Sequence, residues 1–392
     1  MSRLEQLIQQ LCPDGVEYKK LNEVVEIRRG VRVVRSQLSS IGEYPVYQNS
    51  LTPLGYYEKY NVNADTTFVI VAGAAGEIGY STVDFWAADD CFYFEGGKTI
   101  CSKFIYYVLT KNKHLLLSKV RKASVPRLSR VAIEQIIVPF PPLEIQREIV
   151  RILDHFTELT TELTEELTAR KKQYEYYRDA LLTFTDTTPL AILGEVAVVT
   201  KLAGFEFTKY VKYSDSGNTI ALRGLNVKNG RLDLTDVKYI DASDFSKLTR
   251  SKLHVGDMLF TYVGTIGQVA LIDAEDKYYL APNVALIRSV DKRLNPQYMR
   301  YYFQSNNFWK TQINKLLQSS SMQNIPMEKI RKFVIPLPSP EEQNHIVSIL
   351  DKFDALCNDQ TSGLPAEIAA RQKQYEYYRD KLLTFPERKK EG

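Results

Sequence analysis

A fifteen-residue stretch occurs twice in this chain of 392 residues. Residues 170–184 read RKKQYEYYRDALLTF and residues 371–385 read RQKQYEYYRDKLLTF, so thirteen of the fifteen positions are identical. A repeat that returns after 201 residues is far longer than the unit of a solenoid, which runs to about 20–50 residues. We therefore predict two copies of one design, each a globular domain followed by a long helix.

The repeat extends upstream, where PFPPLEIQREIVRILD at 139–154 matches PLPSPEEQNHIVSILD at 336–351. Fainter matches lie inside the globular parts, such as Gly76-Glu-Ile-Gly79 with Gly264-Thr-Ile-Gly267. The helical parts are nearly identical, whereas the globular parts have diverged. Drift after an old duplication would give this pattern. We favour two helices that face the same kind of partner and two domains that face different targets.

Apolar residues recur every three or four positions after Pro139–Pro142, a segment predicted to end the preceding strand. This spacing predicts a coiled-coil seam about forty residues long, or roughly 60 Å. The predicted seam of the first helix comprises Ile145, Ile149, Ile152, Phe156, Leu159, Leu163, Leu167, Tyr174, Tyr177 and Leu181. That of the second comprises Ile346, Ile349, Phe353, Leu356, Ile368, Tyr375, Tyr378 and Leu382.

A tetrapeptide repeat, TELT-TELT-EELT, fills residues 157–168 of the first helix. Four residues advance a helix by about 6 Å, so the repeat makes helix length adjustable in steps. The second copy instead carries Gly363 and Pro365, together with four extra residues. Glycine suits a helix end and proline a helix start, so we predict a break at 362–365.

The globular parts carry short strand signals, including residues 68–72, 91–94 and 136–138, and then 257–263, 283–287 and 333–335. Helical patterns fall near 103–117 and 296–317. We predict an α+β fold with two mixed α/β domains, held apart by two long antiparallel coiled-coil helices in a pseudo-two-fold arrangement. The expected divisions are a first domain at 1–143, a helix at 144–187, a second domain at 188–340, a helix at 341–386 and a basic tail at 387–392.

The formal charge of +4 is only mildly basic, but its distribution is uneven. Residues 98–130 contain nine lysines and arginines and no acidic residue, and a second run holds Arg28, Arg29, Arg32 and Arg35. Such clusters are the electrostatic pattern expected for binding a phosphate backbone. A solvated basic face is the alternative that the charge pattern alone leaves open.

Patterns typical of catalysis or metal binding are missing. Gly96-Gly-Lys-Thr99 ends like a phosphate loop, but Phe92 occupies the position of the required first glycine. Gly73-Ala-Ala-Gly-Glu-Ile-Gly79 is better explained as a tight turn or hairpin. The four cysteines and four histidines show no metal-binding spacing, and no apolar run reaches the length of a membrane span. We expect a cytoplasmic protein without catalytic residues, bound metal or bound cofactor.

The two helical segments and the tetrapeptide repeat resemble the specificity subunit of type I restriction–modification systems, and the resemblance covers essentially the whole chain. It implies that each domain is a target-recognition domain for one half of a split site in double-stranded DNA. It also implies that the helices set the gap and dock two methyltransferase subunits. Those subunits would bind S-adenosylmethionine, and restriction motor subunits would use ATP and Mg²⁺.

Candidate DNA contacts are the cations of the basic runs and the polar side chains of the loops that match them. They are Arg28, Arg32, Arg35, Lys119, Arg121, Lys122, Arg127, Arg223, Asn226, Lys228, Arg231, Gln323 and Asn324. Candidate partner contacts, predicted to face away from the seam, are Tyr176, Arg178, Tyr377 and Arg379. The competing interpretation is a coiled-coil adaptor that bridges two partner proteins without reading DNA.

Overall fold

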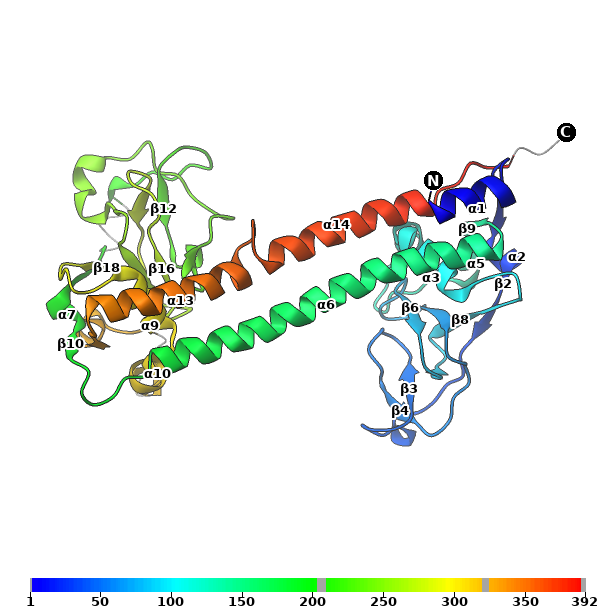
Figure 1. Cartoon of the computed structure of the whole chain (residues 1–392), viewed down its shortest axis with the longest axis horizontal. Coiled ribbons are helices and arrows are strands. Elements are labelled where there is room, and N and C mark those ends of the chain that lie inside the picture. The colour runs from blue at the N-terminus through cyan, green and yellow to red at the C-terminus, as the bar shows by residue number, and fades with distance from the viewer. Residues whose placement is uncertain (1, 203–208, 319–323, 389–392) are drawn as a thin grey trace. The chain divides into compact units, whose positions relative to one another are not determined.

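The structure, a computed structural model, describes residues 2–202, 209–318 and 324–388. It forms two compact units, which we call unit 1 (residues 1–164 and 367–392) and unit 2 (residues 165–366). Each unit combines one mixed α/β domain with two segments of long helix (Figure 1). The predicted α+β class with two domains and long helices is confirmed.

Unit 1 carries an N-terminal helix, nine strands and short helices around the start of α6. Its elements in chain order are α1 (Arg3–Leu11), β1 (Glu17–Lys20), α2 (Leu21–Val24), β2 (Val25–Arg29), β3 (Tyr44–Tyr47), β4 (Gly55–Tyr57), β5 (Thr66–Ile70), β6 (Ile78–Ser81), β7 (Trp86–Ala87), β8 (Cys91–Gly96), α3 (Ser102–Lys111), α4 (Lys113–Ser118), α5 (Arg130–Glu134), β9 (Ile137–Phe140) and α6 (Leu143–Leu181).

Unit 2 follows the same plan with different insertions. Its strands are β10 (Leu190–Ile192), β11 (Ala197–Lys201), β12 (Ile220–Leu222), β13 (Val227–Lys228), β14 (Arg231–Leu232), β15 (Met258–Thr261), β16 (Val269–Leu271), β17 (Tyr278–Leu280), β18 (Val284–Ser289) and β19 (Val334–Pro336). Its helices include α7 (Leu193–Val196), α9 (Pro296–Gln304), α10 (Asn306–Phe308), α11 (Asn314–Gln318), α12 (Met327–Arg331), α13 (Pro340–Asn358) and α14 (Leu364–Leu382), the last of which continues into unit 1.

The central sheets of the two units have the same topology. The order is β2-β8-β5-β6 in unit 1 and β11-β18-β15-β16 in unit 2, with all neighbours antiparallel. Each unit also has a parallel pair, β3–β7 in unit 1 and β12–β17 in unit 2, but the other strands differ, since unit 1 adds β4 to its pair and unit 2 has a β13–β14 hairpin. The duplication predicted from the helices therefore extends to the core of the domains, and the insertions account for their divergence.

The strand and helix predictions for the domains are confirmed. The segment Pro139–Pro142 ends its strand as predicted, because β9 stops at Phe140, although Pro139 itself still pairs with Tyr18 of β1. The β1–β9 sheet has only two strands, so a residue without an N–H group can point its unpaired side away from the ladder. Pro336 is accommodated in the same way in the two-stranded β10–β19 sheet.

Helix α6 is continuous over 39 residues, as its apolar periodicity predicts. Within the tetrapeptide repeat, the hydroxyl of Thr157 donates to the carbonyl of Leu153 (3.0 Å) and that of Thr161 to the carbonyl of Thr157 (3.0 Å). These bonds to residue i−4 satisfy the hydroxyls within the helix itself. The burial along α6 departs from the predicted seam at one point. Leu153 is fully buried, whereas Ile152, which was predicted to lie in the seam, is half-buried.

Two helical segments lie side by side in each unit and run in opposite directions (Figure 1). In unit 1 the ring of Phe156 on α6 stacks on Tyr378 of α14, with 5.3 Å between centroids. In unit 2 Tyr177 of α6 stacks on Phe353 of α13 at 5.4 Å. The antiparallel pairing predicted for the helices is thus present within each unit.

The second helical region is broken as predicted. Helix α13 ends at Asn358 and α14 begins at Leu364, which places Pro365 at the second position of the new helix. Gly363 belongs to the break, where an added Cβ would lie 2.5 Å from the carbonyl oxygen of Ala355. This close approach to the preceding helix explains why the break contains a glycine.

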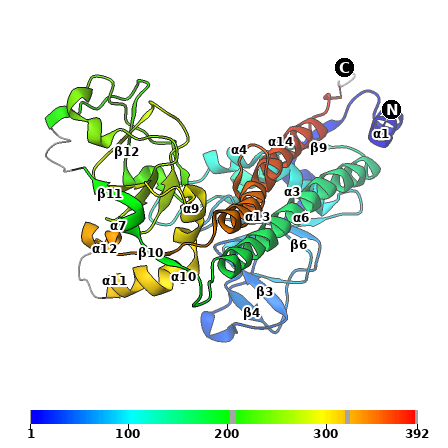
Figure 2. The same ribbon diagram turned by 60° about the vertical axis from the view of Figure 1, so that its left-hand side comes forward.

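Each domain is joined to its helix by an equivalent hydrogen bond. The hydroxyl of Tyr107 on α3 donates to Asp154 of α6 (2.5 Å), and that of Tyr301 on α9 donates to Asp351 of α13 (2.6 Å). Helix α9 lies against α13 in unit 2 (Figure 2). Because Asp154 and Asp351 occupy the same place in the repeat, the contact is a duplicated joint between domain and helix.

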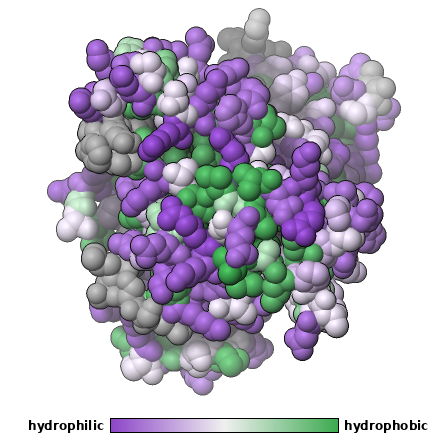
Figure 3. Space-filling model, turned by 90° about the vertical axis from the view of Figure 1, so that its left-hand side faces the viewer, coloured by the Kyte–Doolittle hydropathy of each residue, from purple (hydrophilic) through white to green (hydrophobic). Residues whose placement is uncertain are grey.

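One face of unit 2 shows apolar side chains gathered among hydrophilic ones (Figure 3). Exposed apolar residues of this unit include Leu190 and Ile192 on β10 and Val334 on β19. In the corresponding strand of unit 1, Ile137 pairs with Lys20, so charge replaces one apolar partner there. Among the helices that the structure describes, none combines the length and apolar character needed to span a bilayer.

Candidate nucleic-acid interface

The basic loop of unit 1, which we define as residues 119–127, is closed on itself by backbone hydrogen bonds. The N–H of Arg121 donates to the carbonyl of Arg127 (2.8 Å), and the N–H of Arg127 donates back to Arg121 (3.2 Å). The side chains of Lys119, Arg121, Lys122 and Arg127 are all exposed. A short loop closed in this way presents several cations from a defined backbone.

The basic loop is tethered to the turn that connects β5 with β6. Leu128 donates its N–H to the carbonyl of Val71 (2.8 Å), and Gly73 donates to the carbonyl of Pro126 (3.2 Å). Gly73 has a φ of +80°, and a Cβ on it would lie 2.8 Å from the carbonyl oxygen of Asn49. The glycines at 73–79, predicted to form a turn, therefore permit a close approach of three backbone segments.

The second basic run has two engaged arginines, Arg28 and Arg29, and two without an ion pair. Arg28 forms ion pairs with Glu26 (3.0 Å) and Glu95 (2.9 Å), and its hydrogen bond to Glu26 raises its pKa. Arg32 and Arg35 are exposed and form no ion pair with any residue that the structure describes. Arg28 is therefore less available to a phosphate than the other two.

A turn at Asp89 and Asp90 connects the two basic segments. Arg29 donates from Nε to the carbonyl of Asp89 (2.8 Å), and Val71 donates its N–H to the carbonyl of Asp90 (2.8 Å). Val71 in turn accepts from Leu128 at the end of the basic loop. The strand end that leads to Arg32 and the anchor of the basic loop thus share one turn, whose own side chains, Asp89 and Asp90, are acidic.

Unit 2 places the matching residues Asn324 and Ile325 on the matching turn. Ile325 donates its N–H to the carbonyl of Tyr262 (2.9 Å), as Leu128 does to Val71, and Asn324 forms a β-bridge with Val263. Gly264 and Gly267 have φ of +75° and +83°, like Gly73 and Gly76 of the first turn. Asn324 is half-buried, and Gln323 lies outside the described residues.

The four remaining candidates in unit 2 are engaged inside the domain. Asn226 is fully buried, accepts from the N–H of Arg223 (3.0 Å) and donates to the carbonyls of Asp233 and Asp236. The side chain of Arg223 pairs with Asp236 (2.9 Å). Asn226 therefore shapes a turn and could meet a base only if that turn opened.

The other two candidates of this group also have acidic partners. Lys228 pairs with Asp233 at 2.6 Å, and this hydrogen bond holds the pKa of the Asp233 carboxyl well below its usual range. Arg231 pairs with Asp354 of α13 at 3.1 Å. Apart from Arg28, the candidate cations of unit 1 thus form no ion pair with a described residue, whereas those of unit 2 are paired.

The candidate partner contacts form two equivalent pairs. Tyr176 and Tyr377 are 70% and 62% exposed, whereas the tyrosine that follows each of them stacks on a ring of the neighbouring helix. Arg178 and Arg379 lie over the rings of Tyr174 and Tyr375, at 5.8 and 5.7 Å. These arginines are mostly covered, so the two tyrosines are the more accessible contacts.

No group of three or more histidine, cysteine or acidic side chains gathers in the described part of the chain in a way that could hold a metal ion. Sequence reasoning missed two features of the interface, the tether through Val71 and the approach of Asn49. Neither has a local signal, because both depend on contacts between segments far apart in the chain.

Comparison with known proteins places the chain in a defined group. The family described as "Type I restriction modification DNA specificity domain" matches residues 13–171 and 193–370. A putative type I restriction enzyme specificity subunit of Haemophilus influenzae is 31% identical over 388 residues, covering 94% of this chain and 96% of that protein. The EcoR124I/EcoR124II specificity subunit of Escherichia coli is 34% identical over 303 residues, covering 72% and 71%.

The fold agrees with solved structures. The S subunit of a type I restriction–modification system from M. genitalium has a TM-score of 0.63 at 13% identity and covers 94% of this chain and 96% of its own. A second structure concerns complex assembly and conformational transition of the type I R-M system. Its matching chain has a TM-score of 0.57 at 15% identity, and the match covers 95% of this chain and 98% of that chain. At such low identities the likeness concerns the fold.

Proposed function

Because this chain belongs to the type I restriction–modification DNA specificity family, we propose that each of its domains reads one half of a bipartite DNA site. The proposed reading domains are residues 1–143 and 188–340, and the proposed spacers are residues 144–187 and 341–386. The observation that carries the proposal is the loop tethered to a glycine turn at the same place in both units.

The two loops differ in chemistry, as reading two different half-sites requires. The basic loop of unit 1 offers Arg121, Lys122 and Arg127, and arginine binds phosphates or the acceptor edge of guanine. The matching loop of unit 2 ends with Asn324, whose amide suits the edge of adenine. One scaffold with unlike loops can therefore recognise an asymmetric site.

The duplicated helices would dock two copies of one partner. Tyr176 and Tyr377 lie in identical sequence contexts and are exposed to similar extents, so they form two equivalent contact points. The partners we propose are two methyltransferase subunits that bring S-adenosylmethionine, together with restriction motor subunits that use ATP and Mg²⁺. The chain itself would contribute recognition and no bond chemistry.

The test is a map of adenine methylation in cells with the gene intact, deleted, or carrying Arg127→Ala. A split motif with a fixed gap that disappears on deletion supports the proposal. Arg127→Ala should then weaken or relax one half-site only. Lys59→Ala is the matched control, because Lys59 is an exposed cation of the same unit that pairs with Glu58. If no motif depends on the gene, the chain is an adaptor and the proposal fails.

A further inference from the structure

A β-hairpin with a two-residue turn contacts helix α13 in unit 2. Strands β13 and β14 are joined by Asn229 and Gly230, which have φ of +49° and +83°. This Asn-Gly pair is the favoured sequence for a tight hairpin whose two central residues both have positive φ. A Cβ at Gly230 would lie 2.8 Å from the side chains of Arg300 and Gln304, so the turn sits close to α9.

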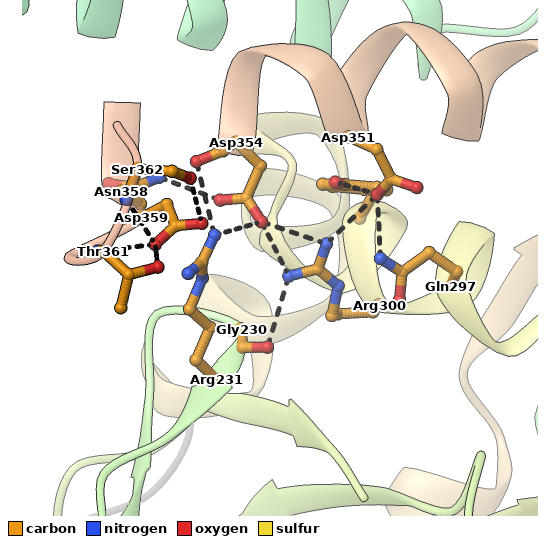
Figure 4. Close-up of polar contacts among 11 residues, drawn as sticks. Gly230, Arg231, Gln297, Arg300, Asp351, Asp354, Asn358, Asp359, Thr361 and Ser362 are labelled. Carbon is orange, nitrogen blue, oxygen red and sulfur yellow. Dashed lines mark hydrogen bonds and ion pairs between the residues drawn. The ribbon is translucent and has the colours of Figure 1, made fainter. Parts of the chain in front are cut away.

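The hairpin turn holds a buried carboxylate from two sides. Asp354 of α13 accepts from Arg300 (3.3 Å) and pairs with Arg231 (3.1 Å), while Arg300 also donates to the carbonyl of Gly230 (3.2 Å) (Figure 4). The side chains of Arg300 and Asp354 are 4% and 10% exposed, and that of Arg231 is 41% exposed. A buried ion pair of this kind fixes geometry, because either charge without its partner would be costly.

The three side chains of Arg231, Arg300 and Asp354, which we call the clamp, lie next to the helix break. Asn358, the last residue of α13, donates to Asp354 (2.9 Å), and Arg231 also donates to the backbone carbonyl of Asp354 (3.3 Å). The break itself is closed by Asp359, which accepts from the N–H of Thr361 (2.7 Å) and the hydroxyl of Ser362 (2.8 Å) (Figure 4). The hairpin therefore contacts α13 in its last turn, just before the helix ends at the break.

The clamp and the break occur together in one half of the repeat. Asp354 corresponds to Thr157 of α6, which donates its hydroxyl to Leu153 within an unbroken helix. Arg300 corresponds to Tyr106 of α3, because α3 and α9 align through Tyr107 and Tyr301. The first half thus has a continuous helix and neither charged partner, and the second half has a broken helix with a charged clamp.

We propose that the β13–β14 hairpin is a brace and that Arg231 is a positioning residue, which fixes the second reading domain to α13 beside the break. The inference rests on the proposed function, in which the helical regions set the gap between half-sites. Without the brace, the end of α13 would be a joint between domain and spacer. With it, the second domain keeps one orientation and the complex accepts one gap length.

This role separates Arg231 from a DNA contact. A residue that contacts a base changes the letters read in its half-site, and one that contacts a phosphate changes affinity and its salt dependence. A brace residue leaves the letters unchanged and alters the range of gaps that the complex accepts. General destabilisation lowers methylation at every gap alike.

The experiment uses the chain assembled with its methyltransferase subunits and a DNA pool in which the two half-sites are separated by gaps of varied length. Methylation is read by sequencing for the wild type, Arg231→Ala, Arg231→Lys and Lys252→Ala. Arg231→Ala is preferred to a change at Asp354, because it leaves the buried Arg300–Asp354 pair intact. Lys252→Ala is the matched control from the same unit, since Lys252 pairs with Asp276 and not with α13, and it is not a candidate DNA contact.

For Arg231→Ala we expect the preference for the native gap over gaps one base pair longer or shorter to fall about fivefold, the upper factor for one partly exposed ion pair. Arg231→Lys should restore part of the preference, and Lys252→Ala should keep all of it. An unchanged gap preference, or altered letters in the second half-site, would overturn the inference. A wild-type complex without any bipartite preference would instead overturn the proposed function.

Discussion

Gln146 and Gln343 make the same three hydrogen bonds in the two units. Gln146 accepts from the N–H of Cys101 (2.8 Å) and donates to the carbonyls of Thr99 (3.1 Å) and Pro141 (2.7 Å). Gln343 accepts from the N–H of Asn295 (2.9 Å) and donates to the carbonyls of Arg293 (2.8 Å) and Pro338 (2.9 Å). Both glutamines are fully buried, and each ties the first turn of a long helix to the segment that begins α3 or α9.

Replacing either glutamine with alanine should destabilise its unit by about 2–4 kcal/mol, because it leaves a buried N–H and buried carbonyls without partners. The free energy of unfolding, measured by denaturant titration, should fall by similar amounts for Gln146→Ala and Gln343→Ala. Gln372→Ala is the control, since Gln372 bonds Glu376 on an exposed helix face and its loss should change stability by less than about 0.5 kcal/mol. A large difference between the two buried sites would show that they are not equivalent.

The combined change Arg121→Ala, Lys122→Ala and Arg127→Ala should weaken DNA binding by the assembled complex and reduce its salt dependence. Each lost phosphate contact lowers the slope of log K against log salt by about 0.9, so the slope should drop by about 2 to 3. Affinity measured over a salt series gives the slope. Lys59→Ala serves again as the control, and an unchanged slope in the triple variant would place the phosphates elsewhere.

Tyr176→Ala and Tyr377→Ala should each remove one methyltransferase subunit from the assembly, and the double variant should remove both. Buried interface tyrosines typically contribute about 2 kcal/mol or more to binding. Native mass spectrometry would count the subunits per specificity chain. Tyr60→Ala, at an exposed tyrosine on a domain, should retain two. Full occupancy of both sites in the double variant would contradict the assignment.

Stability should fall in alkaline solution because of two tyrosines at matching positions, Tyr174, which is buried, and Tyr375, which is half-buried. Burial raises the pKa of Tyr174 to about 12 and that of Tyr375 to about 12. A folded-state pKa above the unfolded value of about 10 means that the stabilising effect is complete below pH 10 and is lost as the pH rises towards 12. For Tyr174 the loss amounts to about 2 kcal/mol.

Unfolding free energies measured from pH 8 to 12 should therefore decline more steeply for the wild type than for Tyr174→Phe. Phenolate absorbance followed in parallel shows whether the ionisation accompanies unfolding. Equal slopes in the two proteins would mean that Tyr174 is solvated in the folded state.

The periodic parts of the structure were predictable from the sequence. The length of α6, the break between Asn358 and Leu364 and the antiparallel pairing follow from apolar spacing, glycine and proline placement and the repeat itself. These signals are local, and the repeat presents most of them twice in the same sequence, so each occurrence supports the interpretation of the other. The predicted seam residue Ile152 is off by one position. The domain buries Leu153, whereas further along α6 the buried face turns towards the partner helix.

The functional side chains were harder to predict, because their surroundings are set by distant segments. Arg231 belongs to a basic-looking stretch, yet the Asn229–Gly230 turn carries it to Asp354, 123 residues further along the chain. The Asn229–Gly230 pair is a sequence signal for a tight turn, but nothing in the sequence indicates that this turn contacts Asp354. Asn226 has the chemistry of a base-reading residue, yet it is fully buried and its amide is used by the carbonyls of Asp233 and Asp236.

The glutamine joints have a consequence for inheritance. Gln146 and Gln343 recognise only backbone atoms, an N–H and a carbonyl contributed by the domain. Any sequence that brings a backbone of this shape to the helix start satisfies them. Recombination within the gene can therefore replace a whole domain without requiring compensating changes at these two glutamines. New specificities can arise by exchange of parts as well as by point mutation.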